Sequence, residues 1–125
     1  MAHQVDLKEG EVVIPVLDAR RMEVYSCVFD DKHKDIRETR AEIIDEASFG
    51  DYVSFTKVHI VGSGAEKCKQ VLHAPNFNFD ISIVPSAKEM AFLAYHKFLN
   101  RDFEDVAYFE PYYLKDFVLQ TKKKP

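Results

Sequence analysis

Cysteine is scarce in this chain, and the positions of its few thiols limit the chemistry to be expected. The 125 residues include two cysteines, Cys27 and Cys68, which are far apart and form no C-x-x-C pair. This usage is typical of buried thiols in a reducing cytoplasm. Neither residue has the setting of a catalytic thiol.

Long apolar runs and excess positive charge are also missing. No run approaches the length of a membrane span, and the N-terminus lacks the basic and apolar segments of a signal peptide. We therefore expect a cytoplasmic protein that does not enter a membrane. The formal net charge of -4 argues against unaided binding to a nucleic-acid backbone.

The familiar catalytic motifs are absent as well. No serine lies in a G-x-S-x-G sequence, and the five histidines form neither an H-x-x-x-H nor an H-E-x-x-H pair. The carboxylates are scattered over segments expected to be exposed. The sequence therefore predicts no catalytic residue, no metal ligand and no cofactor.

The densest apolar stretch, Val12 to Phe29, is interrupted once by the polar residues Asp18–Arg21. Two apolar runs around a short polar break predict a hairpin with strands Val12–Leu17 and Met22–Phe29. Both faces of the second strand are largely apolar. We expect it to be covered on both sides, as an interior strand of a layered α/β domain is.

The next segment gives conflicting signals. Residues Ile36–Ala47 are good helix formers with apolar side chains near helical register. A third antiparallel strand over Ile36–Glu42, with a short helix near Glu46–Val53, would instead continue the meander, and edge strands tolerate such charge. We predict the strand, because helix propensity is a weak prior and the family resemblance described below favours it.

The rest of the chain alternates between strand and helix patterns. Strands are predicted over Lys57–Val61 and Phe79–Val84, with a helix between them. A second helix begins at Ser86, where an S-x-x-E capping box stands, and ends near Leu99. Its apolar stripe consists of Ala87, Met90, Ala91, Ala94 and Phe98. A meander followed by alternating elements predicts an α/β fold with a mixed five-stranded sheet and covering helices.

Gly62, Ser63 and Gly64 connect a predicted strand to a predicted helix. Such a turn can cradle a phosphate, because free N–H groups and the helix dipole point at the anion. This one lacks the lysine of a P-loop, and a simple tight turn explains the glycines equally well. Both interpretations remain open on sequence grounds.

Asp18 ends a buried strand in a turn. A carboxylate there can hold a metal or substrate, but more often it accepts turn N–H groups or pairs with a local arginine, here Arg20 or Arg21. We predict the structural role, because turn chemistry alone explains an aspartate at this position.

The organisation along the chain is simple. Residues 1–10 form a leader, residues 11–119 a single domain and residues 120–125 a basic tail. Before that tail comes an aromatic segment too apolar to remain free, which should dock on the core or on a partner. Its candidate interaction residues are Tyr108, Phe109, Tyr112, Tyr113 and Phe117.

Three stretches resemble one family. DARRMEVYSCVFD (Asp18–Asp30), VGSGAEKC (Val61–Cys68) and AYFEPYYLKDF (Ala107–Phe117) are similar to the C-terminal half of TsaB proteins, formerly called YeaZ or glycoprotease-like, and to Bacteroidetes-type members in particular. The resemblance extends from about Glu11 to Val118. It implies one half of an actin-like (ASKHA), ribonuclease-H-like fold, without the N-terminal half of the family.

The resemblance also implies a function. TsaB is a non-catalytic paralogue of TsaD, which transfers a threonylcarbamoyl group to adenosine in tRNA, and the TsaE ATPase joins the assembly. A scaffold subunit with TsaD-like and TsaE-like partners is therefore expected. A nucleotide-binding enzyme half, or the peptidase of the old family name, is the alternative. Without a partner half, the isolated chain is expected to form a two-fold homodimer.

Overall fold

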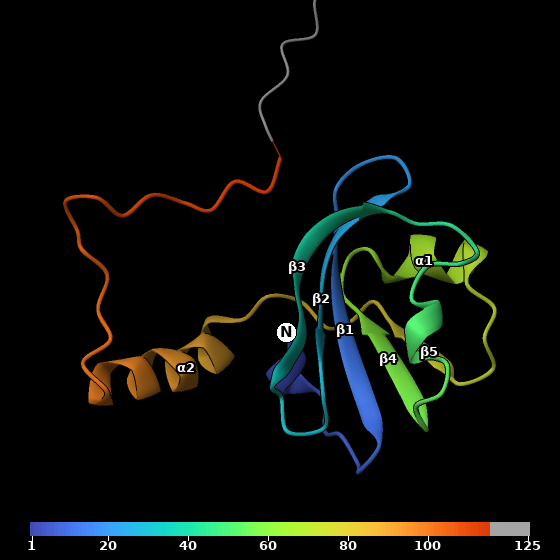
Figure 1. The fold of residues 1–125 in the computed structure, drawn as a ribbon, viewed down its shortest axis with the longest axis horizontal. Helices are drawn as coiled ribbons and strands as arrows, with labels where there is room; N and C mark the ends of the chain where they lie inside the picture. Colours follow the sequence, from blue (N-terminus) through green and yellow to red (C-terminus); the bar gives the residue numbers. More distant parts are fainter. Residues whose placement is uncertain (116–125) are drawn as a thin grey trace, which may run out of the picture.

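A computed structural model describes residues 1–115 of the chain. Its centre is a mixed five-stranded sheet in the order β3-β2-β1-β4-β5 (Figure 1). The strands are β1 (Glu11–Asp18), β2 (Glu23–Phe29), β3 (Asp35–Ile43), β4 (Lys57–Val61) and β5 (Phe77–Asp80). The helical elements are α1 (Ala65–Val71), α2 (Ala87–Leu99) and two 3₁₀ turns, η1 (Ala2–Gln4) and η2 (Gly50–Tyr52).

The predicted meander is confirmed. β1 pairs antiparallel with β2, and β2 pairs antiparallel with β3, so that Tyr25 lies opposite Leu17 on one side and Ala41 on the other. β4 lies parallel to β1 and β5 lies parallel to β4. The segment with helical composition is thus an edge strand, because pairing with β2 outweighs its local preference.

The last strand was predicted at the wrong place. The sequence pattern indicated Phe79–Val84, whereas β5 ends at Asp80. The Asp80 carboxylate accepts hydrogen bonds from the backbone N–H of Ser82 at 2.8 Å and from its hydroxyl at 2.6 Å. This local turn ends the strand and leaves Ile81 exposed.

The short helix expected near Glu46–Val53 is reduced to the single turn η2. Phe49, which precedes it, has a left-handed backbone with φ of 59°. That conformation cannot continue a right-handed helix, so the segment remains a connection. The Phe49 side chain is nevertheless buried against the core.

The two faces of the sheet are covered unequally. α1 packs on one face, where Ala65 and Cys68 join a fully buried set of strand residues: Val12, Ile14, Val16, Val24, Val28, Val58 and Ile60. The opposite face is covered in part by the N-terminal segment, with Ala2 against Val13 and Val61. Tyr25, Cys27 and Phe29 of β2 are only half-buried there.

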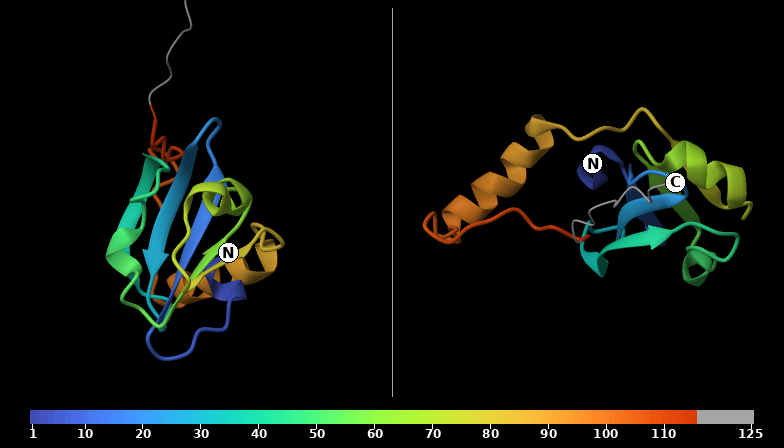
Figure 2. Two further views of the ribbon diagram at one scale, coloured as in Figure 1. Left: turned by 90° about the vertical axis from the view of Figure 1, so that its right-hand side faces the viewer. Right: turned by 90° about the horizontal axis from the view of Figure 1, so that it is seen from above.

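α2 lies beside the sheet, joined to β5 by residues 81–86 (Figures 1 and 2). Its N-terminus is capped as predicted, since the Ser86 hydroxyl accepts a hydrogen bond from the backbone N–H of Lys88 at 3.2 Å. None of its side chains is buried. No helix within residues 1–115 is long and apolar enough to cross a membrane.

Candidate functional site

The β1–β2 hairpin and the glycine turn meet at the carboxyl ends of β1 and β4, where ligands bind in many α/β folds. The Asp18 carboxylate accepts the backbone N–H of Arg20 at 2.7 Å. The backbone N–H of Asp18 donates to the Ser63 hydroxyl at 3.1 Å. The hairpin turn and the glycine turn, which are distant in the sequence, therefore lie together and form one corner of the sheet.

Lys67 of α1 is the charged partner of Asp18, in place of the arginine that was expected. Its ammonium group donates to Asp18 Oδ1 at 2.6 Å, to the carbonyl of Arg21 at 2.5 Å and to that of Glu23 at 3.1 Å. Arg20 and Arg21 instead shape the turn through left-handed φ angles of 70° and 46°. Lys67 thus ties the hairpin to α1, a contact that no sequence pattern signals.

The hydrogen bond from Lys67 holds the pKa of the Asp18 carboxyl below its ordinary value of 3.8, and the backbone N–H of Arg20 adds to this effect. The lowered pKa means that the folded state favours the charged carboxylate. The ion pair therefore contributes to stability at neutral pH and loses that contribution as the pH falls through the lowered pKa.

Three N–H groups at the glycine turn, those of Gly62, Gly64 and Ala65, already have partners. Gly62 donates to the carbonyl of Asp80 at 2.9 Å, Gly64 to that of Val16 at 3.1 Å and Ala65 to that of Gly62 at 3.0 Å. Both glycines also pack tightly, since a Cβ at Gly64 would lie 2.9 Å from Val24 Cγ1. These bonds favour the tight-turn interpretation over the phosphate cradle.

We expect Lys67→Met to destabilise the protein by about 1–2 kcal/mol, because two backbone carbonyls lose a charged donor. Lys69→Met is the matched control, since Lys69 is exposed on the same helix. Urea unfolding followed by circular dichroism measures both. The cost at Lys67 should shrink as the pH falls through the lowered pKa of Asp18, because the carboxylate then takes up a proton. Equal effects at both lysines would contradict the structural role.

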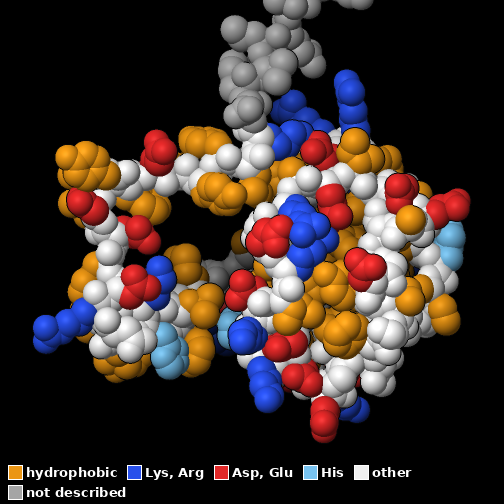
Figure 3. Space-filling model, in the orientation of Figure 1, with side chains coloured by type: hydrophobic (Ala, Val, Ile, Leu, Met, Phe, Trp, Pro, Cys, Tyr) orange, Lys and Arg blue, Asp and Glu red, His pale blue; other side chains and the backbone are white. Residues whose placement is uncertain are grey.

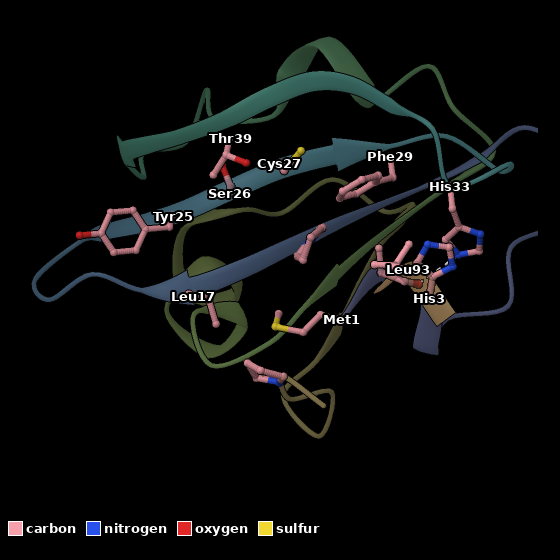
Figure 4. A pocket seen from close by; sticks show the side chains of 13 residues that line it. Met1, His3, Leu17, Tyr25, Ser26, Cys27, Phe29, His33, Thr39 and Leu93 are labelled. Carbon is pink, nitrogen blue, oxygen red and sulfur yellow. Dashed lines mark hydrogen bonds between the residues drawn. The ribbon is translucent and has the colours of Figure 1, made fainter. Parts of the chain in front are cut away.

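The face of the sheet opposite α1 is hollowed. One cavity of about 470 Å³ lies over β1 and β2, and it is mainly apolar (Figure 4). Its lining includes Leu17, Tyr25, Cys27, Phe29 and Leu93. A second cavity of about 330 Å³ shares Leu17 and Tyr25 and reaches Tyr112 and Tyr113. The open face thus carries two adjoining recesses.

Two histidines close one end of the larger cavity. The rings of His3 and His33 stack with their centroids 4.5 Å apart. Burial lowers the pKa of His3, and the neighbouring charge of His33 lowers it further. His33 Nε2 lies 3.1 Å from the carbonyls of Ala2 and Val5, so this side chain holds the N-terminal segment against the sheet.

Some side chains of the aromatic segment are exposed to solvent only, and others lie at the open face of the sheet. Tyr108 and Phe109 are exposed, whereas Tyr112 and Tyr113 also line the second cavity. Lys115, which follows, forms an ion pair with Glu23 of β2. Phe117 and the basic tail at 120–125 lie outside the described residues.

The two thiols have different surroundings. Cys68 is buried against the core, and burial raises the pKa of its thiol to about 12. Cys27 Sγ lies 2.9 Å from the carbonyl of Arg37. Among residues 1–115 there is no group of three histidine, cysteine, aspartate or glutamate side chains placed to hold a metal ion.

The strand order, with an antiparallel meander and two parallel strands, defines the ribonuclease-H-like α/β class that was expected. The fold is similar to a crystal structure of "an uncharacterized protein with similarity to peptidase YEAZ from Pseudomonas aeruginosa". The TM-score is 0.67 at 15% identity, over 85% of this chain and 50% of that one. The chain thus has a YeaZ-like fold and spans half the length of that protein. No family model and no curated protein matches the sequence.

Proposed function

We propose that this chain is a non-catalytic partner subunit of an assembly that forms threonylcarbamoyladenosine in tRNA, where it supports a TsaD-type transferase. The observation that carries the proposal is the agreement between two likenesses. The fold is YeaZ-like, and two of the three sequence stretches that resemble TsaB lie on the β1–β2 hairpin and at the glycine turn of that fold.

Several polar groups at the corner formed by Asp18 and the glycine turn are already hydrogen-bonded within the chain. This supports the role of a non-catalytic partner subunit. The carboxylate of Asp18 is bound by Lys67 and by a turn N–H. The amides of Gly62 and Gly64 are bound to carbonyls of the same chain. Groups committed to internal hydrogen bonds in this way hold the fold together, and using them for chemistry would first require breaking those bonds.

The open face of the sheet is the surface we assign to the transferase. It combines two apolar recesses with half-buried aromatic side chains, among them Tyr25, which lines both cavities. Aromatic side chains in partly enclosed pockets are the usual anchors of protein interfaces. A partner that fills these recesses would remove their apolar surface from water.

Isothermal titration of the chain with a purified TsaD-type transferase, with and without a TsaE-type ATPase, tests the proposal. We expect binding, and Tyr25→Glu should weaken it at least about tenfold, a loss of about 1.4 kcal/mol. Val53→Glu is the control, because Val53 is 51% exposed at the end of η2 and lies outside both cavities. Absence of any heat of binding would refute the assigned role.

The alternative, a nucleotide-binding enzyme half, makes a different prediction. Millimolar ATP should leave the melting temperature of the chain unchanged, because the amides of Gly62, Gly64 and Ala65 at the glycine turn are already bonded. A ligand present at about a hundred times its dissociation constant stabilises by about 2.7 kcal/mol and would be seen readily. A clear upward shift with ATP would favour the enzyme half over the partner subunit.

A further inference from the structure

After β5 the chain leaves the sheet, and it returns to the sheet on the open face. Residues 90–113 are all exposed, and Leu114 is the first half-buried residue after Glu89. Figure 3 shows α2 and the segment after it as an arm rich in hydrophobic side chains, with an opening between this arm and the body of the domain. The end of the arm meets the sheet again at Leu114 and Lys115.

Residues 101–115, which we call the strap, contact the sheet on the face where β2 presents Glu23 and Tyr25. These two residues lie on the same side of β2, because side chains alternate along a strand. The Lys115 ammonium group forms an ion pair with the Glu23 carboxylate, 92 positions away in the sequence. The second cavity lies between the strap and the sheet, and its lining comes from both: Leu17, Tyr25, Thr39, Tyr112, Tyr113, Leu114 and Lys115.

The strap is loosely attached. Tyr112 and Tyr113 stay 82% and 78% exposed, and a cavity of about 330 Å³ remains between them and the sheet. A well-packed protein interior leaves few voids larger than a water molecule. The strap contains no helix or strand, and no backbone hydrogen bond joins its residues 101–115 to the sheet. Segments held by so few buried contacts open at low free-energy cost.

The strap lies on the surface assigned to the transferase. Tyr25, the proposed anchor of that interface, lines the second cavity together with Tyr112 and Tyr113. The Glu23 carboxylate on the same face is paired with Lys115. A partner that filled this recess would need the space that the strap now encloses. The closed strap and a bound partner therefore compete for the same part of the sheet.

We propose that the strap is an autoinhibitory segment, which closes over Leu17 and Tyr25 and has to lift before the transferase can bind there. The Lys115–Glu23 ion pair and the Leu114 side chain hold it closed. The competition rests on the proposed function, because it concerns the partner assigned to this face, whereas the closure itself does not. A site that is open in only a fraction of the molecules has an apparent affinity reduced by that fraction. Weakening the strap contacts should therefore strengthen the partnership.

Tryptophan fluorescence tests the closure without any partner. The chain contains no tryptophan, so Tyr25→Trp introduces a single reporter beneath the strap. In this background Lys115→Glu brings two negative charges together at Glu23, and they repel each other. The change should lift the strap, increase the quenching of the tryptophan by acrylamide and shift its emission to longer wavelength. Unchanged quenching and emission would overturn the strap.

Two further variants control for the change of charge. Lys88→Glu makes the same change at an exposed position of α2 outside both cavities, and it should alter neither quenching nor emission. Exchanging the two charges, with Glu23→Lys and Lys115→Glu in one chain, should restore the shielding. If the exchange leaves the tryptophan as accessible as Lys115→Glu alone does, the ion pair does not hold the strap closed.

Isothermal titration with a purified TsaD-type transferase tests the competition in chains that keep Tyr25. Lys115→Glu should bind at least about threefold more tightly than the native chain. Leu114→Ser, which removes the apolar contact without a change of charge, should do the same, and Lys88→Glu should bind as the native chain does. Unchanged affinities despite a lifted strap would overturn the competition. No binding by any variant would instead refute the proposed function, while the fluorescence would still decide whether the strap closes.

Discussion

Gly62→Ala is expected to cost the fold about 3–4 kcal/mol, since it combines backbone strain with a collision. Gly62 has a φ of +116°, which side-chain-bearing residues rarely adopt. A Cβ there would lie 2.4 Å from the carbonyl oxygen of Val16 and 2.5 Å from Met1 Cε. The turn cannot move aside freely, because the Gly62 N–H is bonded to the Asp80 carbonyl at 2.9 Å.

Gly50→Ala is the matched control for this substitution. Its φ is negative, and a Cβ would meet nothing within 4 Å. The control should be neutral or slightly stabilising, because alanine restricts the unfolded chain more than glycine does. Urea melts of the two variants measure the difference. If Gly62→Ala unfolds at the same urea concentration as the wild type, the turn does not need glycine.

Arg37→Ala is expected to cost about 3 kcal/mol, because it removes one partner of a largely buried ion pair. The Arg37 guanidinium donates to the Glu42 carboxylate at 2.7 Å and to the Ser26 hydroxyl at 2.5 Å. Its carbon Cζ lies 5.6 Å from the centre of the Phe49 ring, and its side chain is 11% exposed. Truncation removes the charged donor of both groups, and the Glu42 carboxylate keeps only the hydrogen bond from the Ser26 hydroxyl.

Arg40→Ala separates this effect from the loss of any arginine on β3. Arg40 pairs with Glu38 at 2.8 Å, but both side chains are more than half exposed, so the pair is worth at most about 1 kcal/mol. Thermal unfolding by circular dichroism should give a clearly lower midpoint for the Arg37 variant alone. Equal midpoints would mean that the buried pair contributes no more than a surface one.

Local chemistry was enough to locate several elements. The strands around the DARR turn and β4 could be read from apolar runs, because a buried strand needs such a run. The start of α2 was marked by Ser86 and its end by Asn100, since capping depends on residues a few positions apart. The mixed α/β class followed from the order of these elements.

β3 shows where tertiary pairing overrides a local preference. Its residues form helices readily, yet the chain folds them as an edge strand against β2. In the strand, Arg37 and Glu42 meet over Ser26. On a helix, residues five apart point about 140° away from each other. The ion pair therefore exists only because β2 and the Phe49 loop bring its members together.

The features of the candidate site likewise fall into those set by the local sequence and those set by tertiary packing. The sequence by itself determined that Asp18 ends a strand in a turn and that glycines follow β4, because turns and strand ends are set by neighbouring residues. Only the tertiary structure decided that Lys67, 49 positions after Asp18, holds that carboxylate, and that no side chain of α2 is buried. Contacts between distant segments depend on how whole elements pack, and no local pattern encodes that packing.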